Sequence, residues 1–210
     1  PGRSIRVMNY TVDGQQAVVV ISSDREPPSL YIFNTKDGTI RHRIDAYPWL
    51  NPNDLAAMRP FWFQASDGVE IQAYLTLPNG DQKQGLPMIV LPHGGPHGPR
   101  DMWGYNPEVQ FFANRGIAVL QVNFRGSGGF GKKFEKSGYR KWGGRIQQDI
   151  VDATKFVMDR GIAAKDRTCI YGASFGGYSA LQAPVVAPGL YQCAVGLVGV
   201  YDLDLLYNDG

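Results

Sequence analysis

The chain has 210 residues, of which 43% are hydrophobic and 19% are charged, so it can bury a core and is neither disordered nor fibrous. Its formal net charge of +2 is too small to indicate a nucleic-acid or membrane partner. No apolar stretch reaches the roughly 18 to 20 residues of a membrane-spanning helix, so we expect a soluble protein. The sequence leaves its compartment open between cytoplasm and periplasm.

The first 50 residues alternate short β-prone runs with turn residues. The runs begin at Ile5 and continue at residues 17–21, 30–33 and 39–44. Asp13-Gly14 and Asp37-Gly38, which lie between the runs, are signals for two-residue hairpin turns. We therefore predict an antiparallel meander of about four strands in residues 1–50, too few to close a sheet on their own.

A segment rich in Pro and Asn, residues 51–60, is predicted to be a connector with one helical turn at residues 54–58. In residues 61–210, β-branched apolar runs alternate with helical segments, which predicts a mostly parallel α/β sheet covered on both faces. The predicted strands are residues 69–77, 88–91, 117–124, 168–171 and 193–198, and the predicted helices are residues 107–116, 145–160 and a segment from residue 175.

The two cysteines, Cys169 and Cys193, lie in apolar runs on neighbouring predicted strands. A free cysteine in such a run behaves as a small buried hydrophobic residue. Because two cysteines alone do not make a disulfide framework, we expect both thiols to be free.

Residues 172–177 read Gly-Ala-Ser-Phe-Gly-Gly, the G-x-S-x-G pattern, between a predicted strand and a predicted helix. This is the setting of a nucleophile elbow, a sharp turn that projects a serine above the carboxyl edge of a sheet. Gly172, Gly176 and Gly177 leave room for the close backbone approach that such a turn requires. The following helix directs free N–H groups and its positive dipole end at the same place. We therefore predict that Ser174 is a catalytic nucleophile.

A second glycine pair, in the sequence His93-Gly94-Gly95, follows the predicted strand 88–91. In an α/β hydrolase this is the place of the loop that supplies the oxyanion hole. Glycines let the backbone approach a substrate carbonyl, so we predict that the N–H groups of Gly95 and Phe175 form the hole. We expect His93 to order the loop through a hydrogen bond.

Four segments of the chain have to be considered together. They are HGGPHG (93–98), NFRGSGGFGKKF (123–134), the WG…QDI run (142–150) and YGASFGGYSA (171–180). In combination they resemble the prolyl oligopeptidase family of serine peptidases, particularly its acylaminoacyl-peptidase-like and dipeptidyl-peptidase-like branch. The resemblance implies an α/β-hydrolase domain that follows a β-propeller and acts on short peptides. Residues 1–50 would then be the last part of the propeller, and residues 61–210 the N-terminal part of the catalytic domain.

A serine nucleophile needs a base, and in α/β hydrolases the triad follows the order serine, acid, histidine. The three histidines, His42, His93 and His97, all precede Ser174. We expect His42 to be a solvated strand residue and His97 to be exposed near the rim of the pocket. None of the three can supply the base in the usual order.

The acid of the triad is also missing from the expected place. The aspartates that follow the serine are Asp202, Asp204 and Asp209. The resemblance implies an acid on a later strand, beyond Gly210. We therefore expect a fragment that is nearly inactive without the remainder of its own chain, which would be its first partner. A truncated sheet exposes an unpaired edge, so self-association of the fragment is a further expectation.

Residues 126–131 also spell G-x-G-x-x-G after a predicted strand, the dinucleotide-binding fingerprint. That fingerprint demands an immediate helix and an acidic residue at the end of the next strand. Here residues 132–134 lead to another glycine, and Asp149 lies inside a predicted helix. We favour a loop that packs beside the active site. Arg125 either pairs with a carboxylate that shapes this loop, which we favour, or meets a substrate terminus.

Two other groups of residues have alternative interpretations. The basic run from Lys132 to Arg145 is interrupted by Glu135 in a nearly neutral chain, which favours a solvated surface over a nucleic-acid site. Trp103 and Tyr105, just after the glycine loop, either line a substrate pocket or complete the core.

These features together predict a serine peptidase that hydrolyses short peptides through an acyl-enzyme on Ser174. Such chemistry uses no cofactor and no metal, and we expect neither. The alternatives are a carboxylesterase of the same fold and a non-catalytic interaction fragment. A preceding propeller favours the peptidase, because a gating domain selects peptides by size.

Overall fold

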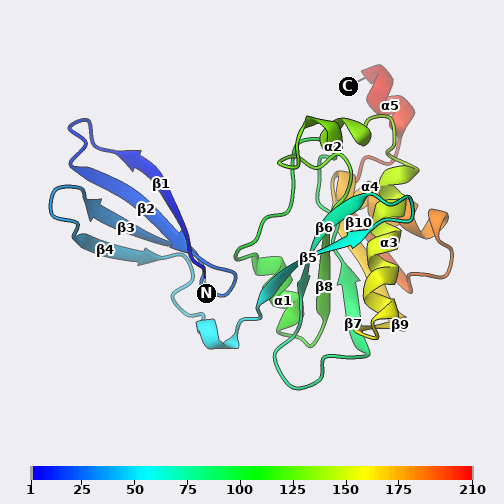
Figure 1. Ribbon diagram of the computed structural model, residues 1–210, viewed down its shortest axis with the longest axis horizontal. Helices are drawn as coiled ribbons and strands as arrows, with labels where there is room; N and C mark the ends of the chain where they lie inside the picture. The colour runs from blue at the N-terminus through cyan, green and yellow to red at the C-terminus, as the bar shows by residue number, and fades with distance from the viewer. Residues whose placement is uncertain (1, 210) are drawn as a thin grey trace.

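The computed structural model describes residues 2–209, without the side chains of His42 and Asp209, so the solvated position expected for His42 lies outside the described residues. The first sheet is antiparallel in the order β1-β2-β3-β4, which confirms the predicted meander. Its strands are β1 (Ser4–Tyr10), β2 (Gln16–Ser22), β3 (Ser29–Asn34) and β4 (Ile40–Asp45). This sheet forms a twisted layer of its own beside the rest of the chain (Figure 1).

The two outer hairpins of this sheet have longer loops than the predicted two-residue turns. The loops are residues 11–15 and 35–39. In each, an aspartate carboxylate accepts the backbone N–H two residues further on, at 3.1 Å from Asp13 and 2.9 Å from Asp37. Gly14 and Gly38 then adopt φ angles of 66° and 70°, which glycine tolerates best. The Asp-Gly signals therefore marked the turns but not their length.

The connector contains one turn of 3₁₀ helix, η1 (Pro52–Asp54), earlier than the predicted turn at residues 54–58. The Asn51 side chain accepts the Asn53 N–H at 3.1 Å, and Pro52 occupies the first turn, where its fixed φ is favourable. Met58 instead begins a strand and pairs with Thr76.

The second sheet has six strands in the order β10-β9-β7-β8-β6-β5. They are β5 (Met58–Gln64), β6 (Glu70–Thr76), β7 (Leu86–Val90), β8 (Ala118–Asn123), β9 (Ala163–Ala173) and β10 (Cys193–Leu197). Strands β10, β9, β7 and β8 are mutually parallel, whereas β6 and β5 are antiparallel to their neighbours. The sheet is thus mixed, and the edge strand β5, which the sequence did not predict, contains Pro60, a residue tolerated at sheet edges.

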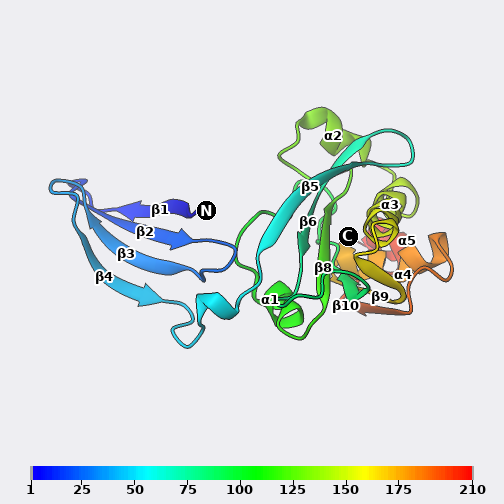
Figure 2. The same ribbon diagram turned by 60° about the horizontal axis from the view of Figure 1, so that its bottom comes forward.

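Helices cover both faces of the second sheet, as predicted (Figure 2). They are α1 (Pro107–Ala113), α2 (Lys132–Ser137), α3 (Arg145–Asp159), α4 (Phe175–Val186) and α5 (Leu203–Asp209). Helices α3 and α4 pack together on one face, and α1 packs against β8 on the other. Asn106 caps α1 by accepting the Glu108 and Val109 N–H groups. None of these helices, within residues 2–209, has the length and apolar character needed to cross a bilayer.

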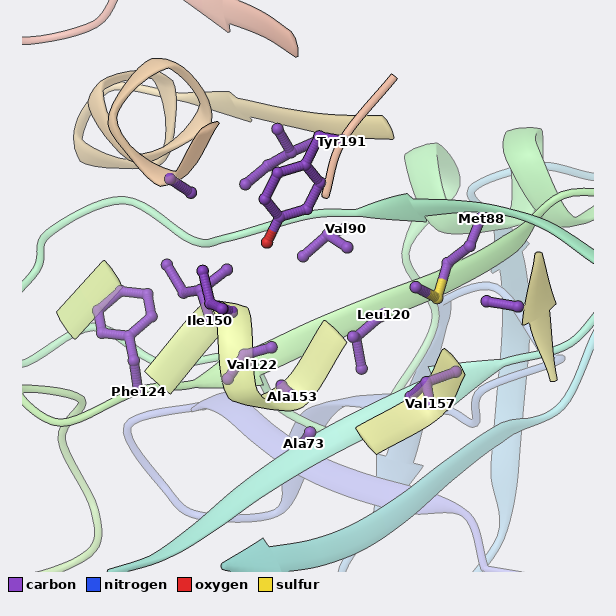
Figure 3. Packing of buried hydrophobic residues seen from close by; sticks show 14 of the residues in the cluster. Ala73, Met88, Val90, Leu120, Val122, Phe124, Ile150, Ala153, Val157 and Tyr191 are labelled. Atoms are coloured by element: carbon purple, nitrogen blue, oxygen red, sulfur yellow. The ribbon is translucent and has the colours of Figure 1, made fainter. Parts of the chain in front are cut away.

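The core lies between the second sheet and helix α3 (Figure 3). Alternate residues of β8, Leu120 and Val122, face Ile150 and Val157 of α3, and each of the four is at most 1% exposed. Burying such a side chain stabilises the fold by about 1.5 to 3 kcal/mol. Val119, which precedes Leu120, points to the α1 face. The two faces of one strand therefore hold the two helix layers in place.

Cys169 and Cys193 form a disulfide, so the prediction of two free thiols is wrong. The parallel register of β9 and β10 places the two residues directly opposite each other, with 4.7 Å between their Cα atoms. That separation lies within the range of disulfide bonds. The pairing depends on strand register, which the sequence does not state.

Gln110 of α1 connects the second sheet to the connector and the first sheet. Its side-chain oxygen accepts the Ala56 N–H at 2.8 Å, and its amide donates to the carbonyls of Ala56 and Asp24 at 2.8 and 3.0 Å. The Asp24 carboxylate in turn accepts the Met58 N–H at 2.8 Å. Buried polar contacts therefore fix the connector on both sides.

Candidate active site

Ser174 lies at the turn between β9 and α4, with φ 56° and ψ −124°. Few non-glycine residues adopt such angles, and they persist only where the surroundings hold them. Here the Ser174 N–H donates to the Leu197 carbonyl at 3.0 Å, and the Ser174 carbonyl accepts the Tyr178 N–H at 3.1 Å. The side chain of Ser174 is exposed. The turn thus has the geometry of a nucleophile elbow.

The three glycines of the elbow have no space for a side chain. A Cβ on Gly172 would lie 2.5 Å from the backbone of Gly176, and one on Gly176 would lie 2.2 Å from the Pro92 carbonyl oxygen. A Cβ on Gly177 would lie 2.8 Å from the Leu197 oxygen. Contacts this short do not occur in folded proteins, so the sharp turn depends on glycine at each place.

The loop that begins at His93 passes directly beside the serine. A Cβ on Gly94 would lie 3.6 Å from Ser174 Cβ and 3.9 Å from Ser174 Oγ. Gly95 is the next residue, and Phe175 is the first residue of α4, where backbone N–H groups lack an acceptor within the helix. The predicted oxyanion donors therefore belong to segments on either side of Ser174. Their role stays a prediction.

His93 is held at both ring nitrogens. Nδ1 lies 2.7 Å from the Gly94 carbonyl oxygen, and Nε2 lies 2.8 Å from the hydroxyl oxygen of Ser127. The ring stacks on Phe124 with 4.2 Å between centroids. Burial lowers the pKa of His93 to about 4, against the opposing effect of its bond to the Gly94 carbonyl. The ring is therefore neutral at pH 7.

His97 is half-buried, so the expectation that it is exposed at the pocket rim is wrong. The Trp142 indole N–H donates to its Nε2 at 3.2 Å, and the Tyr139 ring meets it edge-on at 4.6 Å between centroids. Burial also lowers the pKa of His97. The lone pair that a base would use is thus engaged by Trp142. These aromatic partners come from a segment that is distant in sequence.

Among the side chains that the structure describes, none forms a hydrogen bond to Ser174 Oγ. The Asp202 carboxylate accepts the Leu205 N–H at 2.9 Å at the start of α5, and Asp204 lies in that helix. The side chain of Asp209 lies outside the described residues. The role of Ser174 as a nucleophile therefore stays a prediction, and none of these side chains is placed to serve as its base.

Arg125 is 6% exposed and is bound by two carboxylates, which matches the loop-shaping alternative. Its N–H and guanidinium donate to Asp149 of α3 at 2.6 to 3.2 Å, and the guanidinium also donates to Asp67 at 2.6 and 3.0 Å. Arg145 pairs with Asp67 as well. The bond from Arg125 holds the pKa of Asp67 well below its usual range. Each guanidinium nitrogen of Arg125 thus donates to a carboxylate of this chain, as the loop-shaping alternative requires.

The glycine-rich segment 126–131 packs against the loop at residues 93–98. The Gly98 N–H donates to the Gly126 carbonyl, and the Gly128 N–H donates to the Gly98 carbonyl, both at 3.1 Å. A Cβ on Gly128 would lie 2.1 Å from the Gly98 oxygen. Contrary to expectation, the short helix α2 follows the segment immediately. The backbone contacts nevertheless hold the active-site loop, and Asp149 is engaged by Arg125.

Trp103 and Tyr105 lie against the connector. The Trp103 indole N–H donates to the Met58 carbonyl at 3.1 Å, and the ring of Tyr105 lies 5.5 Å from that of Tyr47. Neither shares a hydrogen bond or an aromatic contact with residues 172–177 in the part of the chain that the structure describes. Both residues are half-buried and lie outside the hydrophobic core, so their role stays a prediction.

Sequence reasoning missed two buried polar groups near the loop, Ser127 and Asp101. Ser127 is fully buried beside His93. The Gln121 amide donates to Asp101 Oδ1 at 2.7 Å, whereas Asp101 Oδ2 and Gln121 Oε1 are buried without a partner. Burial raises the pKa of Asp101 to about 7. No local pattern marks either residue, because the contact of Ser127 with His93 and that of Asp101 with Gln121 join residues 20 or more positions apart.

Comparison with known proteins agrees with this geometry. The sequence model of the prolyl oligopeptidase family matches residues 103–210. The chain is 36% identical to dipeptidyl aminopeptidase BIII of Pseudoxanthomonas mexicana, over 99% of this chain and 31% of the relative. It is 35% identical to dipeptidyl peptidase family member 6 of Caenorhabditis elegans, over 97% and 30%. A solved puromycin-hydrolysing peptidase of Mycobacterium tuberculosis superposes with a TM-score of 0.80 at 28% identity, over 90% of this chain and 30% of that one. The chain thus spans less than a third of the length of these relatives.

Proposed function

This chain belongs to the prolyl oligopeptidase family, and we propose that it provides the nucleophile and the oxyanion-binding groups of a serine peptidase. The observation that carries the proposal is the exposed Ser174, held at positive φ at the start of α4. Gly94 lies against its side chain. A serine in a glycine-rich surface turn without a catalytic role would not need so restrictive a backbone.

In the proposed reaction, Ser174 Oγ attacks the carbonyl carbon of the scissile bond and forms a tetrahedral intermediate. The N–H groups of Gly95 and Phe175 stabilise its oxyanion, supported by the positive dipole end of α4. The intermediate then expels the amine, which takes the proton that the base received from Ser174, and leaves an acyl-enzyme that water hydrolyses. The Ser174 N–H takes no part, because it is bonded to the Leu197 carbonyl. The base that accepts the serine proton comes from residues outside this chain.

The proposed substrates are short peptides, and release of N-terminal dipeptides is the first specificity to test. Two similar proteins carry the names dipeptidyl aminopeptidase and dipeptidyl peptidase. Their similarity extends over nearly the whole of this chain, including the first sheet. Dipeptidyl amides with a fluorogenic leaving group, compared with p-nitrophenyl esters, separate this peptidase from a carboxylesterase.

The test uses the full-length protein that includes residues 1–210, its Ser174→Ala variant and the isolated 210-residue chain. We expect hydrolysis of dipeptidyl amides by the full-length protein and a loss of about 10⁶-fold in kcat for the variant. A fluorophosphonate probe should label Ser174 in the full-length protein and barely label the isolated chain, which lacks a base. Hydrolysis of esters alone would favour the carboxylesterase, and equal labelling of both proteins would contradict the need for a base from outside.

A further inference from the structure

Ser127 is a fully buried residue of the glycine-rich segment, with its hydroxyl between a histidine ring nitrogen and a backbone carbonyl. Its Oγ lies 2.8 Å from His93 Nε2 and 2.7 Å from the Phe124 carbonyl oxygen. The other ring nitrogen of His93, Nδ1, lies 2.7 Å from the Gly94 carbonyl oxygen. A row of three polar contacts thus runs from Phe124 to the loop beside the nucleophile.

These three contacts need three protons, but only two are available at neutral pH. A neutral imidazole carries one N–H, and the Ser127 hydroxyl carries one O–H. His93 is neutral because burial lowers its pKa to about 4. If Nε2 carried the proton, the lone pair of Nδ1 would face the Gly94 oxygen at 2.7 Å, an unfavourable contact between two acceptors. If Nδ1 carries it, the Ser127 hydroxyl has to donate to Nε2.

The second arrangement leaves no group without a partner. The Phe124 carbonyl also accepts the Ser127 backbone N–H at 3.0 Å, so it stays bonded when the hydroxyl turns to His93. The Ser127 hydroxyl gives up its bond to the Phe124 carbonyl at 2.7 Å, but both ring nitrogens of His93 and the Gly94 carbonyl then have partners. The arrangement with the proton on Nδ1 is therefore the more stable one.

The Gly94 carbonyl and the Gly95 N–H belong to the same peptide group. Because that peptide is trans, its C=O and N–H bonds point in opposite directions. A bond that fixes the Gly94 carbonyl on the His93 side consequently directs the Gly95 N–H to the other side. Gly94 itself lies against Ser174, so the orientation of this one peptide decides where an oxyanion donor points.

We propose that Ser127 is a positioning residue for the oxyanion hole. Its hydroxyl donates to His93 Nε2 and thereby fixes the tautomer whose Nδ1–H holds the Gly94–Gly95 peptide. The inference rests on the proposed function, because it assigns the Gly95 N–H to the oxyanion. Ser127 acts only through His93, and it does not touch the substrate.

The two loops do not depend on this hydroxyl for their attachment. The backbone bonds between Gly98 and residues 126 and 128 join them independently. Ser127→Ala should consequently keep the loops together and change only the tautomer of His93. A matched control is Ser179→Ala in helix α4, which removes another fully buried hydroxyl. The Ser179 hydroxyl accepts a hydrogen bond from the Gln147 amide of α3 at 3.0 Å.

The experiment measures kinetics and the histidine tautomer in the same full-length proteins. For Ser127→Ala we expect kcat on a dipeptidyl amide to fall about tenfold or more, since loss of a whole oxyanion donor costs about 10²- to 10³-fold. KM should change less than threefold, and a peptide-aldehyde inhibitor should weaken by the same factor as kcat. Ser179→Ala should retain wild-type kcat. Nitrogen-15 NMR should place the His93 proton on Nδ1 in the wild type and show a shift toward Nε2 in Ser127→Ala.

Each outcome decides the inference. A wild-type kcat in a folded Ser127→Ala variant, or a wild-type ring protonated on Nε2, overturns the role of Ser127 while the proposed function stands. Absence of hydrolysis by the unmodified protein overturns both. If Ser127→Ala does not fold, Ser127→Gly removes the same hydroxyl within a segment that is already rich in glycine, and an unchanged kcat in that variant overturns the inference.

Discussion

Replacement of Asp101 by asparagine tests whether this buried carboxyl is protonated in the folded protein. Its Oδ2 and the Oε1 of Gln121 are both buried without a partner, so an ionised Asp101 leaves two acceptors unsatisfied. Burial raises its pKa to about 7, from 3.8 for an isolated aspartate. The folded-state pKa is higher than the unfolded-state pKa, so folding favours the protonated carboxyl. The unfolding free energy that this carboxyl contributes is therefore largest below pH 3.8 and is lost as the pH rises through 7.

The magnitude follows from the interval of about two pH units between pH 5 and the folded-state pKa of about 7. At about 1.4 kcal/mol per pH unit, the unfolding free energy of the wild type should lose about 3 kcal/mol through Asp101 between pH 5 and pH 8. Asp101→Asn cannot ionise and should not lose it. The variant should therefore gain about 3 kcal/mol relative to the wild type across this range.

The assay is urea-induced unfolding of both proteins at intervals between pH 5 and pH 8. Titration of His93, whose lowered pKa makes the fold less stable as pH falls from 6.5 toward 4, is common to both proteins and cancels in the difference. Asp166→Asn, at a carboxylate with an 86% exposed side chain, controls for loss of a negative charge. A difference between Asp101→Asn and wild type that does not change with pH would refute the assignment.

Four further variants test the packing around the site. Gly94→Ala should melt at the same temperature as the wild type, because its Cβ would meet atoms only at 3.6 Å or more. It should nevertheless lower kcat/KM about tenfold or more by crowding Ser174, and wild-type kinetics would contradict this. Gly176→Ala should abolish soluble, folded protein, since its Cβ would lie 2.2 Å from a backbone oxygen; a wild-type circular dichroism spectrum would show that the elbow tolerates a side chain. Arg125→Met should lower the unfolding free energy by about 3 to 5 kcal/mol, because it leaves the buried Asp149 unpaired. Adding Asp149→Leu to this variant should recover part of the lost unfolding free energy, and a further loss would argue against the unpaired carboxylate as the cause. Gln110→Ala should cost about 2 to 3 kcal/mol in the same assay by leaving buried backbone groups without partners; a loss under 0.5 kcal/mol would contradict the proposed fixing of the connector.

The sequence by itself determined the features that depend on local order along the chain. Alternation of β-branched runs with helical segments predicted the sheet and helices α1, α3 and α4. The elbow at residues 172–177 was predictable because a sharp turn restricts the residues on either side of its serine, and the structure shows that their side chains have no space. Asn106 and Pro107 likewise marked the start of α1 because capping is a local interaction.

Only the tertiary structure decided which distant residues meet. The disulfide between Cys169 and Cys193 follows from the register of two parallel strands, and the pairing of Arg125 with Asp149 follows from the packing of α3 beside β8. The contact of Ser127 with His93 joins two loops 34 residues apart. Burial then changes the proton affinity of His93. A local pattern carries no information about such contacts, because strand register and side-chain burial are set when the chain packs.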